Sequence, residues 1–274
     1  MTIMLHQSDC REVLRTLPDE SVHCVVTSPP YWGLRDYGVN GQIGLEPAPD
    51  LFVAELVNVF REVRRVLRDD GTLWLNLGDG YKEKNLIGIP WRVAFALQAD
   101  GWWLRQDIIW SKPNPMPESV TDRCTKAHEY IFLLSKNARY YYDAAAVAEA
   151  LQCAPHAPSN KKLDSSRNDH DQMAKVWGTN GVRNKRSVWE VATQPFSEAH
   201  FATFPALLIE PCILAGCPKG GTVLDPFAGA GTAGLVADRL QRNAILIELN
   251  PEYAVMAQRR IRGDAGMFTE IEVQ

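Results

Sequence analysis

Apolar runs and helix signals alternate along most of the chain. Continuous apolar runs predict buried strands over residues 22–28, 71–79, 107–112, 129–136, 222–227 and 244–249. The stretches between them predict helices over residues 51–69, 90–98, 205–216, 229–240 and 252–261. Strands alternating with helices favour an α/β fold, in which a mostly parallel sheet is covered by helices on both faces.

Capping and turn residues set the predicted boundaries of these elements. Asp50 is expected to cap the helix over 51–69, and Gly71 is expected to end it. One face of that helix carries its apolar residues, which are Phe52, Leu56, Val59, Phe60, Val63 and Leu67. Pro211 predicts a break in the helix over 205–216, because proline removes a backbone donor.

Residues 151–187 interrupt this pattern with a polar and basic composition. They contain seven Lys or Arg against three Asp and few aliphatic residues, whereas the whole chain has a formal net charge of −4. An overall basic coat for nucleic acid is therefore excluded, and any contact with DNA or RNA must be local. The segment is either a solvated insertion or a surface for a polyanion.

The remaining composition indicates a globular protein of the cytoplasm. The chain is 46% hydrophobic and 23% charged, which suits a sizeable core. No apolar run approaches the roughly 18 residues that span a membrane, and the first residues lack a secretion signal. The six cysteines form no C-x-x-C pair, so we expect reduced thiols and no metal site.

A glycine turn carries the first functional motif. Residues 229–234 satisfy G-x-G-x-x-G between a strand and a helix, and Glu248 ends the next strand 17 residues after Gly231. Glycines let a ligand approach the backbone, the helix start offers N–H groups, and the carboxylate can accept both ribose hydroxyls. Helix–strand packing also recruits glycine, but this context predicts a site for an adenosine-type cofactor.

Asp225, just before the glycines, discriminates between adenosine cofactors. An acid at this position would repel a pyrophosphate but suits a ligand with a positive amino group, such as S-adenosylmethionine. Only 26 residues follow Glu248, whereas a nicotinamide enzyme normally places this unit early and builds its sheet afterwards. The pattern therefore favours S-adenosylmethionine over a dinucleotide.

A second motif, Ser28-Pro29-Pro30-Tyr31, follows the first strong strand. One interpretation is a rigid proline turn followed by packed aromatic residues. In the other, a fixed carbonyl and the serine oxygen accept hydrogen bonds from a single NH₂ group. The tyrosine ring would then offer a stacking face for a base, worth about 1–3 kcal/mol.

Together the two motifs resemble those of the amino-group DNA methyltransferases. The family's catalytic motif, (D/N/S)-P-P-(Y/F/W), matches residues 28–31, and its cofactor motif, D-P-F-x-G-x-G-T, is similar to residues 225–232. The catalytic motif comes first, which is the circularly permuted arrangement of the β group. The resemblance covers nearly the whole chain. It implies a Rossmann-like methyltransferase fold, with a seven-stranded, mostly parallel sheet that has one antiparallel strand.

The resemblance also assigns parts of the chain. It implies a catalytic half over residues 1–150, a small target-recognition region over 151–190 and a cofactor-binding half over 191–274. The implied catalytic residues are Ser28, Pro29, Pro30 and Tyr31. The implied cofactor-binding residues are Asp9 for the adenine, Glu248 for the ribose, and Phe204, Pro205, Asp225, Phe227, Gly229, Gly231, Thr232 and Asn250. The DNA-binding candidates are Trp32, Lys112, Asn114, Lys161, Lys162, Arg167, Arg183, Lys185 and Arg186.

The implied activity is methyl transfer from S-adenosylmethionine to the exocyclic amino group of a flipped-out base in double-stranded DNA. Cytosine N4 and adenine N6 both stay open. The implied partners are double-stranded DNA, a second copy of the chain in a homodimer, and a cognate restriction endonuclease. The alternatives are an RNA or protein-glutamine amino-methyltransferase and, from a different class, an NAD-dependent oxidoreductase.

Overall fold

One nine-stranded sheet organises the residues described by the computed structural model, which are 1–150, 181–194, 204–266 and 269–274. Its strands are β1 (Thr2–Gln7), β2 (Val22–Thr27), β3 (Leu67–Leu77), β6 (Trp103–Ser111), β7 (His128–Ser135), β10 (Val188–Glu190), β11 (Thr222–Asp225), β12 (Asn243–Glu248) and β13 (Glu270–Val273). Their order across the sheet is β10-β6-β7-β3-β2-β11-β12-β1-β13. Two short pairs lie outside it: β4 (Tyr81–Lys82) with β5 (Asn85–Leu86), and β8 (Glu149–Ala150) with β9 (Val182–Arg183).

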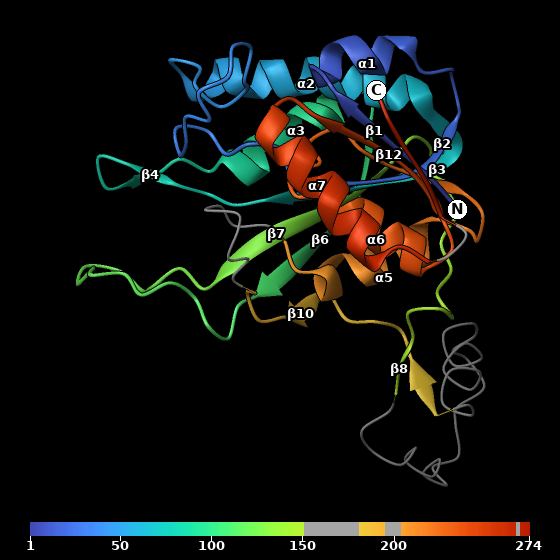
Figure 1. Cartoon of the computed structure of the whole chain (residues 1–274). Helices are drawn as coiled ribbons and strands as arrows, with labels where there is room; N and C mark the ends of the chain where they lie inside the picture. Colours follow the sequence, from blue (N-terminus) through green and yellow to red (C-terminus); the bar gives the residue numbers. More distant parts are fainter. Residues whose placement is uncertain (151–180, 195–203, 267–268) are drawn as a thin grey trace, which may run out of the picture.

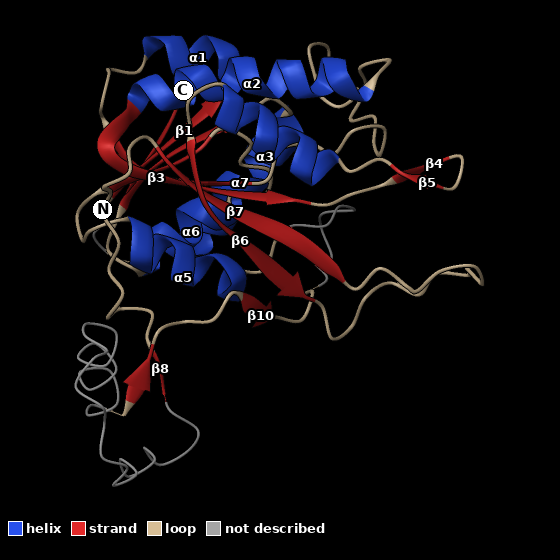
Figure 2. Ribbon diagram, turned by 180° about the vertical axis from the view of Figure 1, so that it is seen from behind, coloured by secondary structure: helices blue, strands red, loops and turns tan. Residues whose placement is uncertain are grey.

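Helices cover both faces of this sheet, as predicted. One face carries α1 (Cys10–Thr16), α2 (Pro49–Val66) and α3 (Ile89–Ala99). The opposite face carries α5 (Ala206–Gly216), α6 (Thr232–Arg239) and α7 (Pro251–Asp264). Figures 1 and 2 show the two helical layers with the sheet between them. The expected α/β architecture with a mostly parallel sheet is confirmed.

Strand polarity also agrees with the family resemblance. Within the described sheet, β7 runs antiparallel to β3 and β6, and every other neighbouring pair is parallel. The seven inner strands match the expected number, and β10 and β13 extend the sheet at its two edges. Both edge strands are short and mostly exposed, so their sequences carry little hydrophobic signal.

The order of the strands brings the two motifs together. Strands β11 and β12, from the C-terminal part of the chain, lie between β2 and β1 from the N-terminal part. These neighbours are parallel, so their carboxyl ends meet at one edge of the sheet. Ser28 directly follows β2 and Pro226 directly follows β11, which places both loops at that edge.

Three predicted boundaries are wrong. Helix α2 begins at Pro49 with extended Ala48 as its N-cap, so Asp50 lies in the first turn instead of capping it. The helix ends at Val66, and Gly71 lies inside β3 instead of ending the helix. Pro211 does not break α5, which continues to Gly216. This helix is almost wholly apolar and buried against the sheet and α6, so packing outweighs the lost hydrogen bond.

Candidate active site

A cavity of about 200 Å³ opens where the loops after β2, β11 and β12 meet. Ser28 and Tyr31 from the N-terminal part of the chain line this cavity, and so do Phe227 and Gly229 from the C-terminal part. The two motifs therefore share one cavity although about 200 residues separate them. The other predicted residues on the wall are Asp9, Pro29, Pro30, Phe204, Thr232, Glu248 and Asn250.

Asp225 lies behind this wall, at the end of β11, and is fully buried. Its Oδ1 accepts hydrogen bonds from the Thr27 hydroxyl at 2.6 Å and from the Phe227 N–H at 3.1 Å. Its Oδ2 has no hydrogen-bond partner among the described residues. Burial raises the pKa of Asp225 to about 7, although both hydrogen bonds lower it, and the nearby Glu248 adds to the rise.

Glu248 holds a fixed position on the cavity wall. It ends β12, its Oε2 accepts from the Gly229 N–H at 2.7 Å, and its Oε1 accepts from the Asn250 N–H at 2.8 Å. Burial raises the pKa of Glu248, and the backbone hydrogen bonds oppose that rise. The side chain of Asn250 caps α7 by accepting from the Glu252 N–H at 2.9 Å.

The glycine turn owes its shape to two positive φ angles. Gly229 has φ 50° and Gly231 has φ 73°, a region that most side chains avoid. A Cβ on Gly231 would also lie 2.9 Å from the Cβ of Ala257 in α7. Gly231, the N-cap of α6, and Pro205, the N-cap of α5, do not line the cavity themselves.

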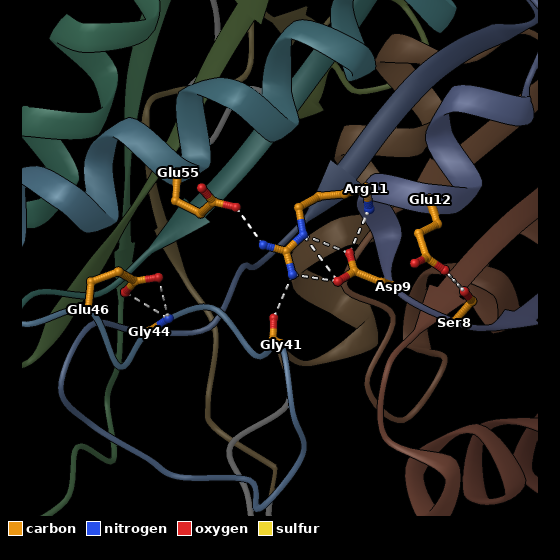
Figure 3. A network of polar contacts seen from close by, with 8 residues as sticks. All are labelled: Ser8, Asp9, Arg11, Glu12, Gly41, Gly44, Glu46 and Glu55. Atoms are coloured by element: carbon orange, nitrogen blue, oxygen red, sulfur yellow. Dashed lines mark hydrogen bonds and ion pairs between the residues drawn. The ribbon is translucent and has the colours of Figure 1, made fainter.

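Asp9 lies on the cavity wall and belongs to the network of polar contacts that Figure 3 shows. Its carboxylate accepts from the Arg11 backbone N–H at 2.8 Å and from the guanidinium of the same residue. Arg11 also donates to Glu55 of α2 at 2.6 Å and to the Gly41 carbonyl at 2.7 Å. Burial raises the pKa of Asp9, but the bonds from Arg11 outweigh it and lower the pKa below its usual value. Contact between Asp9 and an adenine stays a prediction.

One wall of the cavity is formed by residues 34–43, which lie in the loop between β2 and α2. Tyr37 of this loop makes an edge-to-face contact with Tyr253 of α7, with ring centroids 6.2 Å apart. An aromatic residue within a glycine-rich loop is the only sequence signal for this role. The other wall residues from the loop are Leu34, Arg35, Val39, Gly41, Gln42 and Ile43.

Glu129 joins Tyr31 to the sheet through contacts that the sequence does not reveal. The Tyr31 hydroxyl donates to Glu129 Oε2 at 2.8 Å, and the Asn76 amide donates to the same oxygen at 3.2 Å. Lys112 forms an ion pair with Oε1. Burial, and then the charge of Glu129, raise the pKa of Tyr31 well above its usual value. The phenol therefore stays protonated and acts as the donor.

Three candidate DNA-binding residues engage in internal contacts. The Trp32 indole N–H donates to the Glu46 carbonyl at 2.8 Å, and Lys112 is paired as described above. The Asn114 side chain exchanges two hydrogen bonds with the Thr193 backbone, at 3.1 and 2.9 Å. Their polar groups thus stabilise the protein itself, and a direct contact with DNA stays a prediction for each.

The basic candidates divide into described and undescribed residues. Arg183 and Arg186 both pair with Glu149, at 3.3 and 3.0 Å. The Lys185 ammonium lies 4.9 Å from the centroid of the Trp189 ring. Three candidates, Lys161, Lys162 and Arg167, lie outside the described residues.

Comparisons with known proteins agree with this geometry. A profile of the family described as DNA methylase matches residues 22–259. Type II methyltransferase M.Cfr9I of Citrobacter freundii is 48% identical over 95% of this chain and 88% of its own length. Type II methyltransferase M.SmaI of Serratia marcescens is 47% identical, with coverages of 92% and 88%.

Two solved structures share the fold. A putative DNA modification methylase of Thermus thermophilus, complexed with S-adenosyl-L-methionine, has a TM-score of 0.68 and 29% identity over 99% of each chain. The cytosine-N4-specific PvuII DNA methyltransferase has a TM-score of 0.72 and 20% identity, covering 99% of this chain and 96% of that one.

The chain belongs to the DNA methylase family, which confirms the resemblance drawn from the two motifs. It is an amino-methylating DNA methyltransferase that uses S-adenosylmethionine. This assignment excludes the oxidoreductase alternative. Among the described residues, no helix is both long and apolar enough to cross a membrane.

Proposed function

We propose that this chain methylates the exocyclic amino group of a flipped-out base in double-stranded DNA, with cytosine N4 as the first expectation. The shared cavity carries the proposal, because Tyr31 and Gly229 line the same space. A nucleobase on the first loop and an adenosine cofactor on the second would meet there.

The cavity residues fit S-adenosylmethionine, whose sulfonium supplies an electrophilic methyl group when bound. Glu248 is held by two backbone N–H groups, so its remaining lone pairs could accept the ribose hydroxyls. Asp225 supplies the second fit. Its Oδ2 is buried behind the cavity wall without a partner among the described residues, so a positive amino group held in the cavity beside Phe227 would favour the ionised carboxylate through its charge.

The first motif would orient the accepting amino group. The Ser28 hydroxyl and the Pro29 carbonyl can each accept one hydrogen bond from it, which directs the nitrogen lone pair towards the methyl group. The Tyr31 ring can stack on the base. Rate enhancement then comes from positioning and from dipoles aimed at the positive charge that develops on nitrogen. The methylated nitrogen loses one proton after transfer.

Two observations bear on how the target base is reached and on which base it is. An amino group within a duplex cannot reach a cofactor in this cavity, so the base must leave the stack at a cost of a few kcal/mol. By resemblance, serine at position 28 is more usual in cytosine-N4 enzymes than in adenine enzymes. The dimer, the cognate endonuclease and the cytoplasmic location stay predictions.

Labelling of plasmid DNA tests the function. The purified chain is incubated with plasmid and tritiated S-adenosylmethionine, and the nucleosides are then analysed by mass spectrometry. We expect N4-methylcytosine. N6-methyladenine would overturn the choice of base, and unlabelled DNA would overturn the function.

Variants of the first motif test its assigned role. Ser28→Ala and Tyr31→Ala should lower turnover by about 100-fold while cofactor binding stays within about twofold. Ser21→Ala is a matched control. The Ser21 hydroxyl donates a solvent-exposed hydrogen bond to the Pro18 carbonyl, and Ser21 lies just before β2, at the end of the strand opposite to Ser28. Equal losses of turnover and cofactor binding would contradict the role.

A further inference from the structure

Glu129 is a shielded carboxylate to which three other side chains point. We propose that it is a positioning residue, which holds the Tyr31 ring in the orientation that receives the target base. This inference rests on the function proposed above. It assigns Glu129 no contact with substrate or cofactor, since Glu129 does not line the cavity and Tyr31 does.

The network is built across three neighbouring strands. Glu129 lies on β7, Asn76 lies on β3, and Lys112 directly follows β6. Strand β7 pairs with both other strands, so the sheet itself sets the positions of the three side chains. Tyr31, from the loop after β2, is thereby attached to a rigid part of the molecule.

Both oxygens of the Glu129 carboxylate accept hydrogen bonds from neighbouring side chains. Oε2 accepts from the Tyr31 hydroxyl and the Asn76 amide, and Oε1 accepts from Lys112. The side chains of Glu129 and Lys112 are only 15% and 17% exposed, so their ion pair compensates two charges that are largely shielded from solvent. Rotation of the carboxylate would break these bonds, which restricts the place where the Tyr31 hydroxyl can lie.

Gly78 restrains the ring along a second direction. A Cβ at this position would lie 2.5 Å from Cε2 of Tyr31 and 3.1 Å from its Cζ. The ring edge therefore packs directly on the Gly78 backbone, while the hydroxyl is tied to Glu129. A stacking platform held at its edge and its tip loses little conformational entropy when a base arrives.

The chemistry of glutamine makes Glu129→Gln a sharp test. A carboxylate has two accepting oxygens, whereas an amide has one acceptor and one donor. If the amide oxygen faces Lys112, its NH₂ group opposes the Asn76 amide, and the Tyr31 hydroxyl must turn from donor to acceptor. If the amide is flipped, its NH₂ group opposes Lys112 instead. Either orientation disrupts the network without changing its size.

The experiment is a double-mutant cycle on methylation of plasmid DNA, using Tyr31→Phe, Glu129→Gln and the double variant. Each single change should lower kcat by about 10-fold, with KM for S-adenosylmethionine within about twofold. If Glu129 acts through the Tyr31 hydroxyl, the double variant should be no slower than the slower single variant. Losses that multiply would overturn the proposal.

Two controls distinguish a loss of the contact between Glu129 and Tyr31 from other causes of a lower kcat. Glu62→Gln is matched in chemistry, because Glu62 pairs with Arg65 on α2 away from the cavity, and it should leave kcat unchanged. Tyr31→Phe removes one oxygen atom, so it tests the proposal even if Glu129→Gln does not fold; unchanged kcat in Tyr31→Phe would overturn it. Absence of DNA labelling by the wild-type chain would overturn the proposed function first, and this inference with it.

Discussion

At the scale of single residues, the raised pKa of Asp225 predicts that cofactor binding depends on pH. Its pKa is raised to about 7 by burial, so folding favours its neutral form. A bound ammonium group would instead favour the carboxylate. We therefore expect the affinity for S-adenosylmethionine to weaken about tenfold for each pH unit below 7, as measured by titration calorimetry.

The same shift predicts the stability of the ligand-free protein. Because the folded-state pKa lies above the ordinary 3.8, the stabilising contribution of this group is complete below about pH 4 and declines as the pH rises towards 7. Asp225→Asn should flatten both pH profiles. Parallel profiles for wild type and variant would show that another group controls them.

The acids of the site differ in how far the sequence reveals them. Asp225 and Glu248 follow from the glycine motif, because each ends a strand beside it. Glu129 belongs to neither motif and lies 98 positions from Tyr31. Only the pairing of β7 with β3 and β6 brings it within hydrogen-bond distance of the Tyr31 hydroxyl, and side-chain geometry across strands cannot be derived from residue order.

At the scale of elements, β3 shows why some strand boundaries cannot be predicted from the sequence. Its first residues include the exposed run Arg68, Asp69 and Asp70, which is typical of a turn. Distant groups nevertheless bind their backbone: Asn137 donates to the Asp69 carbonyl at 2.9 Å, and the Tyr141 N–H donates to the Asp70 carbonyl at 2.8 Å. Long-range partners of this kind override local propensity.

The start of α7 supports a prediction about stability. The Asn250 side chain caps this helix, whereas its backbone N–H fixes Glu248. Asn250→Ala should therefore cost about 1 kcal/mol of unfolding free energy, and Asn250→Ser should retain most of it. Urea denaturation measures both. Asn58→Ala, on the exposed side of α2, is the matched control and should cost nothing.

Cofactor binding in the Asn250 variants tests whether the Asn250 side chain only caps α7 or also contacts the cofactor. Since the backbone N–H survives each substitution, Glu248 should keep its position and the affinity should change by less than about threefold. A much larger loss in Asn250→Ala, with normal stability, would mean that the side chain itself contacts the cofactor.

At the scale of the whole molecule, the N-terminal part over residues 1–150 and the C-terminal part over residues 204–266 contribute strands to one sheet. Strands β11 and β12 are inserted between β2 and β1, so neither part can complete the central sheet alone. Hydrophobic residues from both parts also share the cores on each face of the sheet. The motif order predicts a permuted fold, but this interleaving of strands emerges only in three dimensions.

This interleaving predicts how the protein responds to its cofactor. The cavity takes residues from both parts of the chain, so a ligand bound there should stabilise the entire sheet. At 100 times its Kd, S-adenosylmethionine should contribute about 2.7 kcal/mol, which corresponds to a rise in Tm of about 5–10 °C. Scanning calorimetry should show one transition that moves as a whole. NADH at the same concentration should leave Tm unchanged, and two transitions of which only one shifts would mean that the two parts fold independently.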